Sequence, residues 1–109
     1  MTDSGSLGAL SSLEFLELAS ASNALEMAKA NPVWNADEIR LYESMLDRAW
    51  EMVGRVADGL GDRQAMALAD RCLWGMKWSD VATDCAMSMR TARRYVDDAL
   101  AFLDRGSLE

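Results

Sequence analysis

The sequence predicts an all-α protein in which an N-terminal helical hairpin precedes a unit of three further helices. Half of the 109 residues are hydrophobic, Ala, Leu and Met are abundant, and there is one proline. No stretch of six or more residues alternates apolar with polar side chains, as a half-buried strand would. Apolar residues recur instead at spacings of three and four, which is the period of one helix face. This length and composition fit one domain with a modest core.

The first expected helix follows a polar N-terminus, residues 1–10, which we expect to be flexible. It runs from Ser11 or Ser12 to Ala30 and ends there because Pro32 disfavours a helical conformation at the residue before it. Its apolar side is expected to contain Leu13, Leu16, Ala24, Leu25 and Ala28.

The second expected helix begins after Asn35, which has the position of an N-cap, with Glu38 able to complete a capping box. It extends to about Asp58. Its buried stripe is expected to be Ile39, Tyr42, Leu46, Ala49, Val53 and Val56. Further apolar side chains lie outside or beside that stripe and are candidates for an association surface: Trp34, Met45, Trp50 and Met52.

Three more helices follow a break at residues 59–61. The first runs from Asp62 to about Trp74, with Ala65, Leu68, Ala69, Cys72 and Leu73 facing inward. Gly75 then provides a left-handed C-cap. Ser79 is the expected N-cap of a short helix over residues 80–86, and Ser88 is the expected N-cap of a last helix that reaches Asp104. We expect residues 106–109 to be a tail or a cloning scar.

Helices of about thirteen, seven and sixteen residues, the last two separated by a tight turn, are typical of a helix-turn-helix. Val81, Ala82 and Cys85 suit the buried side of the short helix, and Met87 suits an apolar position in the turn. The last helix has its expected buried stripe at Ala92, Tyr95, Val96, Ala99, Leu100 and Leu103. Its outer face is then Met89, Arg90, Arg93, Arg94 and Asp97.

Charge is distributed unevenly along this chain of net charge −7. Residues 1–61 hold ten acids and four bases, whereas residues 62–109 hold eight acids and seven bases. Within residues 71–95 the balance reverses, with five bases and two acids. A basic patch on an acidic molecule indicates a local anionic partner and argues against a protein that coats nucleic acid non-specifically.

The cluster Arg90, Arg93 and Arg94 falls in the first two turns of the last expected helix. Free N–H groups at a helix N-terminus favour anions, and the planar guanidinium fits phosphate or a guanine edge. We therefore predict that double-stranded DNA is the partner. The candidate contact residues are Lys77, Ser79, Ser88, Met89, Arg90, Thr91, Arg93 and Arg94.

The stretch GDRQAMALADRCLWGMKWSDVATDCAMSMRTARRYVDDALAFL resembles the fourth conserved region of sigma factors and the related helix-turn-helix of small phage-type transcriptional regulators. The resemblance lies in Gly75, Ser79, Val81, Ala82, Ser88, Thr91, Ala99 and Leu100. It implies that residues 62–105 are a DNA-binding unit with its recognition helix starting at Ser88. Residues 11–61 match no such pattern and form the acidic hairpin that we expect to mediate association.

Several alternatives stay open at this level. The arginine cluster could be a solvated face with pairs such as Arg93–Asp97 and Arg94–Asp98. Trp74 and Trp78 suit lids over the core better than stacking platforms. Among the methionines, Met76 and Met89 are expected on the outside.

The chemistry of the chain argues against an enzyme. There is no histidine, nucleophile elbow, Gly-rich phosphate loop or acid cluster at metal spacing, so we expect no catalytic residue and no cofactor. The thiols of Cys72 and Cys85 are expected in apolar surroundings, and two thiols without histidine do not predict a zinc site. The sequence predicts no membrane segment and no signal peptide, which indicates a cytoplasmic protein.

Two association hypotheses remain for the acidic half. The first is a homodimer, which would place two recognition helices on one side of the molecule. The second is an adaptor or inhibitor that binds RNA polymerase or another protein through the acidic helices, with the helix-turn-helix reduced to a scaffold. Surplus apolar surface on the hairpin is consistent with either hypothesis.

Overall fold

The computed structural model describes residues 11–31, 33 and 35–108, with side chains as far as Arg105. The predicted all-α class is confirmed, since this part of the chain contains helices, turns and no strand. None of its helices combines the length and the apolar character that crossing a membrane requires.

The first expected helix is divided into α2 (Ser11–Ala19) and α3 (Ala21–Lys29). At the junction the hydroxyl of Ser20 donates to the backbone carbonyl of Glu17 at 2.6 Å, a local bond that competes with the helix ladder and bends helices. The expected apolar side is therefore wrong for α2. Leu13 and Leu16 are 55% and 41% exposed, whereas Phe15 is fully buried.

Helix α4 (Ala36–Leu60) is longer than predicted and starts without the expected capping box. The side-chain amide of Asn35 donates to the carbonyl of Asn31 at 3.0 Å and caps no helix N–H. Gly59 does not break the helix but belongs to its last turn. A Cβ at Gly59 would lie 2.2 Å from the ring of Phe102, so the absence of a side chain allows α4 to approach α7.

The remaining helices are α5 (Asp62–Cys72), α6 (Trp78–Asp84) and α7 (Met89–Leu108). The left-handed turn at Gly75 is confirmed by its φ of +65°. Ser79 is not the N-cap of α6, which begins two residues earlier than expected after Lys77. The cap at Ser88 is confirmed, because the backbone N–H of Thr91 donates to the Ser88 hydroxyl at 3.1 Å.

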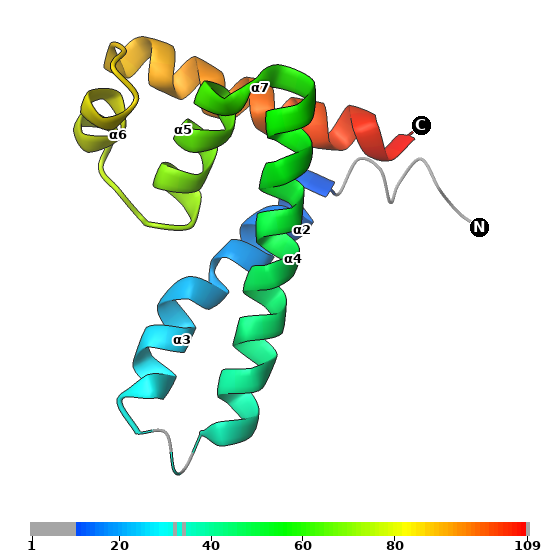
Figure 1. Cartoon of the computed structure of the whole chain (residues 1–109), viewed down its shortest axis with the longest axis vertical. Helices are drawn as coiled ribbons and strands as arrows, with labels where there is room; N and C mark the ends of the chain where they lie inside the picture. The colour runs from blue at the N-terminus through cyan, green and yellow to red at the C-terminus, as the bar shows by residue number, and fades with distance from the viewer. Residues whose placement is uncertain (1–10, 32, 34, 109) are drawn as a thin grey trace.

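The helices form a flat molecule of 43 × 42 × 18 Å (Figure 1). Helix α3 lies beside the N-terminal half of α4, and together they form an arm that points away from α5, α6 and α7. The arm explains why the radius of gyration is 15.0 Å, whereas a compact chain of this length would have about 13 Å. The three C-terminal helices, residues 62–108, are called the three-helix unit below.

One hydrophobic core connects the N-terminal helices with the three-helix unit. It includes Phe15 from α2, Val56 from α4, Leu68 from α5 and Val96 from α7. The carboxylate of Asp104, near the end of α7, accepts from the backbone N–H and the hydroxyl of Ser12 at 2.7 and 3.1 Å. Helix α7 is therefore fixed along its length, which gives its N-terminal turns a defined position.

Candidate functional site

The first two turns of α7 carry the predicted arginine cluster on an exposed face. Four of its side chains are exposed: Met89, Arg90, Arg93 and Arg94. The predicted stripe on the opposite side is confirmed by Ala92, Val96, Ala99 and Leu103, which are all buried, while Tyr95 and Leu100 are half-buried against the core. The division between the two faces follows directly from the period of the helix.

The start of α7 is organised by Ser88 and Thr91. The Ser88 hydroxyl accepts from the Thr91 N–H and donates to the Thr91 hydroxyl at 3.0 Å. Ala86, two residues before Ser88, has φ of +57°, a conformation that residues with a Cβ adopt at a cost. Met87 is half-buried and packs against the core, as expected for the apolar residue of the turn.

Two arginines contact the indole of Trp78 from different helices. The guanidinium of Arg71 lies 4.5 Å from the ring centroid, and that of Arg93 lies 5.1 Å from it. Contacts of this kind contribute on the order of 0.5–1 kcal/mol at exposed sites. They fix the direction of Arg93 relative to α6. Arg94 lies 5.9 Å from the ring of Tyr95.

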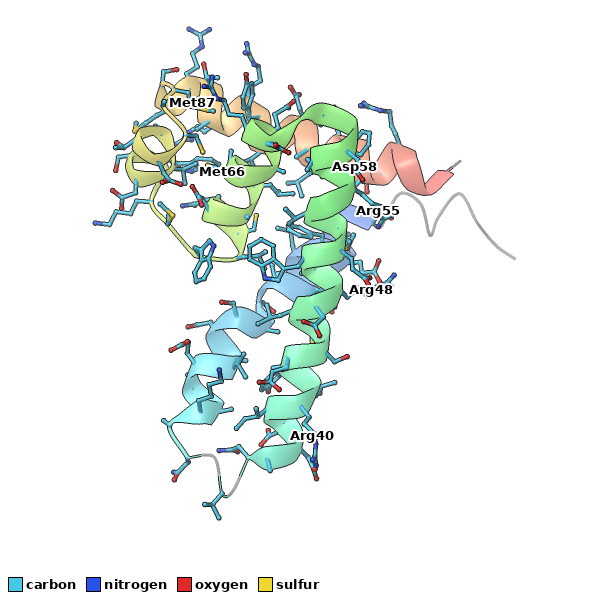
Figure 2. The ribbon with its side chains drawn as sticks, viewed as in Figure 1. Arg40, Arg48, Arg55, Asp58, Met66 and Met87 are labelled. Carbon is cyan, nitrogen blue, oxygen red and sulfur yellow. The ribbon has the colours of Figure 1, made fainter. Side chains whose placement is uncertain are left out.

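The cluster is free of acidic partners in the described part of the chain. The ion pairs within 4.0 Å in this part of the chain are Arg40–Asp37 and Arg48–Glu14. The alternative pairs Arg93–Asp97 and Arg94–Asp98 therefore do not form there. Arg40, Arg48 and Arg55 lie along the edge of α4 that faces away from α3 (Figure 2). These three bases therefore do not extend the basic face of α7.

Two further predicted contact residues lie at the start of α6. Lys77 is exposed and extended, with φ of −66° and ψ of 154°, and Ser79 is exposed on the first turn. Ser79 uses its backbone carbonyl to accept from the Thr83 hydroxyl at 3.0 Å. Its own hydroxyl is not a helix cap, which corrects the role that the sequence suggested.

The loop between α5 and α6 differs from the prediction in two side chains. Trp74 is no lid, because it is 68% exposed, whereas Trp78 is half-buried against the core. Met76, expected outside, is half-buried because the turn at Gly75 folds it inward. Its N–H donates to the Asp70 carbonyl at 3.0 Å, and its carbonyl accepts from the Arg71 guanidinium at 2.9 Å.

The predicted association residues are only partly on the surface. Met52 is 1% exposed and belongs to the core, so its assignment is wrong. Helix α4 packs against helices on more than one side, which widens its buried face beyond the single stripe that was expected. Met45 is half-buried, Trp50 is 42% exposed, and Trp34 lies outside the described residues.

Trp50 and Trp74 form an exposed aromatic pair that links α4 with the end of α5. Their ring centroids lie 6.4 Å apart at an interplanar angle of 62°, an edge-to-face arrangement. Both line a surface hollow, together with Ser22, Leu25, Glu26, Leu46 and Leu73. The sequence placed Trp50 on the association surface and Trp74 over the core, and it did not predict their pairing, because the pairing depends on how α4 and α5 pack.

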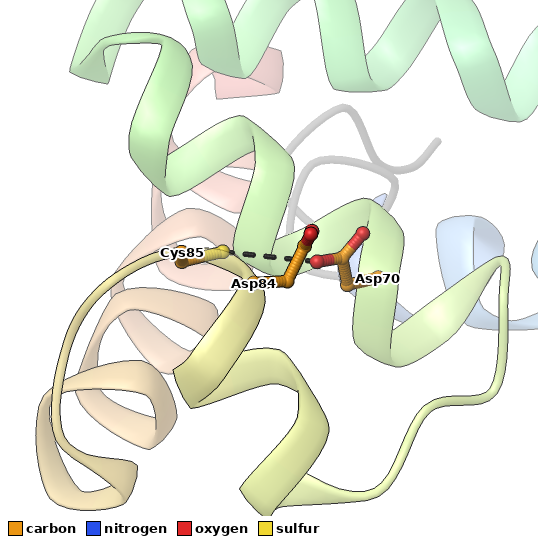
Figure 3. Close-up of side chains that lie close together, drawn as sticks. All are labelled: Asp70, Asp84 and Cys85. Atoms are coloured by element: carbon orange, nitrogen blue, oxygen red, sulfur yellow. Dashed lines mark hydrogen bonds between the residues drawn. The ribbon is translucent and has the colours of Figure 1, made fainter.

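The structure also brings together three side chains whose clustering the sequence did not predict. Asp70, Asp84 and Cys85 have their carboxylate and thiol atoms within 4.8 Å of one another (Figure 3). Asp70 is 7% exposed, and the Cys85 thiol donates to its carboxylate at 3.7 Å. Asp70 lies at helical spacing between Ala67 and Leu73, which the structure buries, but of these two only Leu73 was predicted to face inward.

Burial governs the ionisation of this cluster. It raises the pKa of Asp70 to about 6, and a hydrogen bond and charge repulsion from Asp84 act in the same direction. Burial also raises the pKa of Cys85 to about 11, with the charges of Asp70 and Asp84 adding to the effect. The thiol therefore stays protonated at neutral pH and acts as a weak donor. Two carboxylates and a thiol are also donor types found at metal sites, but no second feature of the described residues indicates a cation.

Comparison with protein families, curated proteins and solved structures gives no match.

Proposed function

We propose that this protein is a small DNA-binding transcriptional regulator that inserts the N-terminal turns of α7 into the major groove. One observation carries the proposal. Arg90, Arg93 and Arg94 are exposed on the first two turns of a capped helix, and none has a carboxylate within 4.0 Å among the described residues. Arginines that served only a solvated helix face would be expected to use the nearby acids.

The surroundings of each exposed basic or hydroxyl side chain indicate whether it would contact a base or a phosphate. The side chain of Arg90 has no hydrogen bond, ion pair or ring contact with any described residue, so it has the most freedom to reach a base edge. Arg93 is held against Trp78 and suits a fixed contact with a base or phosphate. Arg94 and Lys77 suit the DNA backbone. Thr91 accepts from Ser88, which leaves its own hydroxyl proton available for a phosphate.

The packing of the three-helix unit supports a helix-turn-helix assignment. Helix α6 has seven residues, four residues separate it from α7, and Val81, Ala82 and Cys85 on its inner side are buried. Short helix, tight turn and longer helix are the order found in such units. The resemblance to the fourth region of sigma factors points to a regulator of the phage type.

Electrostatics predicts weak binding by a single copy. Only five bases lie within residues 71–95, while residues 1–61 carry an excess of six acids, so most of the molecule repels DNA. Affinity for duplex DNA should therefore fall steeply with salt. A homodimer would increase the number of contacts and place two recognition helices on one duplex.

The test compares two triple variants that remove the same charge from different faces. R90A/R93A/R94A removes the α7 cluster, and R40A/R48A/R55A removes three arginines from the outer edge of α4 (Figure 2). Binding to a fluorescent duplex is measured by anisotropy from 20 to 200 mM salt, a range of roughly one decade.

The α7 variant is expected to lose binding and to reduce the slope of log K against log salt by roughly 2 to 3, about 0.9 for each phosphate contact. The α4 variant should keep the wild-type slope. Equal losses in both variants would mean that only overall charge matters, and an unchanged α7 variant would overturn the proposal.

The second candidate function is an adaptor or inhibitor that binds RNA polymerase or another protein. The exposed pair Trp50–Trp74 favours this reading, because surface tryptophans beside an apolar hollow are frequent at protein interfaces. Sedimentation of wild type and W50S/W74S at micromolar concentration separates a homodimer formed through this pair from a monomeric adaptor. A wild-type dimer that the variant loses supports association through this pair, whereas a wild-type monomer of 12.0 kDa favours the adaptor.

A further inference from the structure

Asp70 is a buried acid at the contact between α5 and the end of α6. Its side chain points toward Asp84 and Cys85, which are the last residue of α6 and the residue after it (Figure 3). The thiol of Cys85 donates a hydrogen bond to this carboxylate at 3.7 Å, and a thiol is a weak donor. A carboxylate that is 93% removed from solvent has little to stabilise its charge here.

No cation compensates for the two carboxylates within the described residues. Arg71, the next residue on α5, donates to the carbonyl of Met76 and stacks on Trp78. Arg63, two turns earlier on α5, acts on the charge state of Cys85 but forms no ion pair within 4.0 Å in this part of the chain. The neighbouring groups that act on the pKa of Asp70 are Asp84 and Cys85. Because Asp70 is buried and Asp84 is exposed, a proton between the two adjacent acids is favoured on Asp70.

The contact lies at a point where helix packing controls the start of α7. Helix α6 has seven residues and no side-chain cap at its N-terminus, so it depends on packing to stay formed. Cys85 packs in the core and leads into the turn at residues 86–88, whose last residue caps α7. Only the turn at residues 86–88 therefore separates Asp84 and Cys85 from the start of α7.

We propose that the contact between α5 and α6 is a pH-sensitive device, in which a proton on the buried carboxyl of Asp70, facing the exposed side chain of Asp84, holds the end of α6 on α5. Loss of the proton leaves two negative charges facing each other and allows α6 to open toward solvent. This proposal concerns the conformation of α6 and holds whether or not the protein binds DNA.

The ionisation of Asp70 places the transition in an accessible range. Its pKa is about 6 in the folded protein and 3.8 when the group is free in water. If opening exposes Asp70, the opening equilibrium should increase by about tenfold between pH 5 and pH 7.5. The sign follows because the closed state has the higher pKa and is therefore the state that a fall in pH stabilises.

Hydrogen exchange of the backbone amides in residues 78–84 measures this opening directly. NMR exchange rates at pH 5.0 and 7.5, corrected for intrinsic exchange and recorded in EDTA, give the opening constants. Wild type should show the change of about tenfold. D70N removes the titrating group and should abolish the change, while D80N, which removes an exposed acid of the same helix, should keep it.

Three results would overturn the proposal. Wild-type opening constants could be equal at the two pH values, D70N could retain the change, or D80N could lose it. If D70N does not fold, the carboxyl ¹³C chemical shift of Asp70 in wild type decides the question. A titration near pH 6 that moves downward in D84N supports a proton held by Asp70 beside Asp84, and a titration near pH 4 in wild type contradicts it. Dependence of the response on added Zn²⁺ would assign the contact to a cation instead of a proton.

Discussion

Gly59 and Gly54 provide a direct test of how α4 packs against α7. Both lie inside α4, yet their surroundings differ. A Cβ added at Gly54 has nothing within 4 Å, whereas a Cβ at Gly59 would lie 2.2, 2.6 and 3.0 Å from three carbons of the Phe102 ring. The same substitution to alanine should therefore have opposite effects at the two positions.

The expected magnitudes follow from two opposing effects. Alanine stabilises a helix interior relative to glycine by about 0.5–1 kcal/mol, so G54A should gain about that amount. G59A gains less because Gly59 lies next to the helix end, and it also forces the Phe102 ring to move. Overpacking of this kind typically costs about 1–3 kcal/mol. We expect a net loss of about 1 kcal/mol, since Phe102 borders a hollow into which the ring can partly shift.

Urea unfolding and thermal unfolding, both followed by far-UV circular dichroism, measure the stability of both variants. A loss of about 1 kcal/mol should lower the Tm of a domain of this size by roughly 4–8 °C. The double variant G59A/F102L tests the cause, because a branched aliphatic side chain is shorter than the ring and should recover part of the loss. Stabilisation of G59A to the same extent as G54A would refute the close packing of α4 on α7.

Two further predictions concern the three-helix unit. S88A should lose about 1 kcal/mol of unfolding free energy because it removes the N-cap of α7, while S79A, at an exposed non-capping position, should change stability by less than about 0.5 kcal/mol in the same assay. The contribution of Asp70 to stability should increase as pH falls, since its pKa of about 6 when folded exceeds the unfolded value of 3.8. The unfolding free energy of wild type minus that of D70N should then rise by about 1.4 kcal/mol from pH 7.5 to pH 5. A difference that stays constant or falls would contradict the assignment of the raised pKa to Asp70.

The local features of the chain were largely predictable from the sequence. The Ser88 cap, the buried stripe of α7 and the left-handed turn at Gly75 all depend on residues within a few positions of one another. The outward direction of Arg90, Arg93 and Arg94 followed from the same stripe, because side chains opposite a buried face point to solvent. The candidate interface on α7 could therefore be located without the structure.

Errors arose where a local signal met a competing contact. Ser79 and Asn35 have the residue types of N-caps, yet α6 starts earlier and the Asn35 amide bonds to Asn31 instead. The helical period continues through residue 20, but α2 ends at Ala19, where the Ser20 hydroxyl donates to the carbonyl of Glu17. In each case several hydrogen-bonding choices of similar energy were available, and packing selected one of them.

The helical class, the capped start of α7 and the placement of its arginines could be predicted from the sequence, because these depend on interactions over three or four residues. The packing of the helices was needed to show that Met52 is buried, that Trp74 meets Trp50, and that Asp70 faces Asp84. Burial depends on how many helices surround a face, and a contact between distant residues depends on the angle at which those helices cross. Neither quantity is contained in the periodicity of a single helix, so the apolar pair and the acid cluster become visible only when α4, α5 and α6 are packed together.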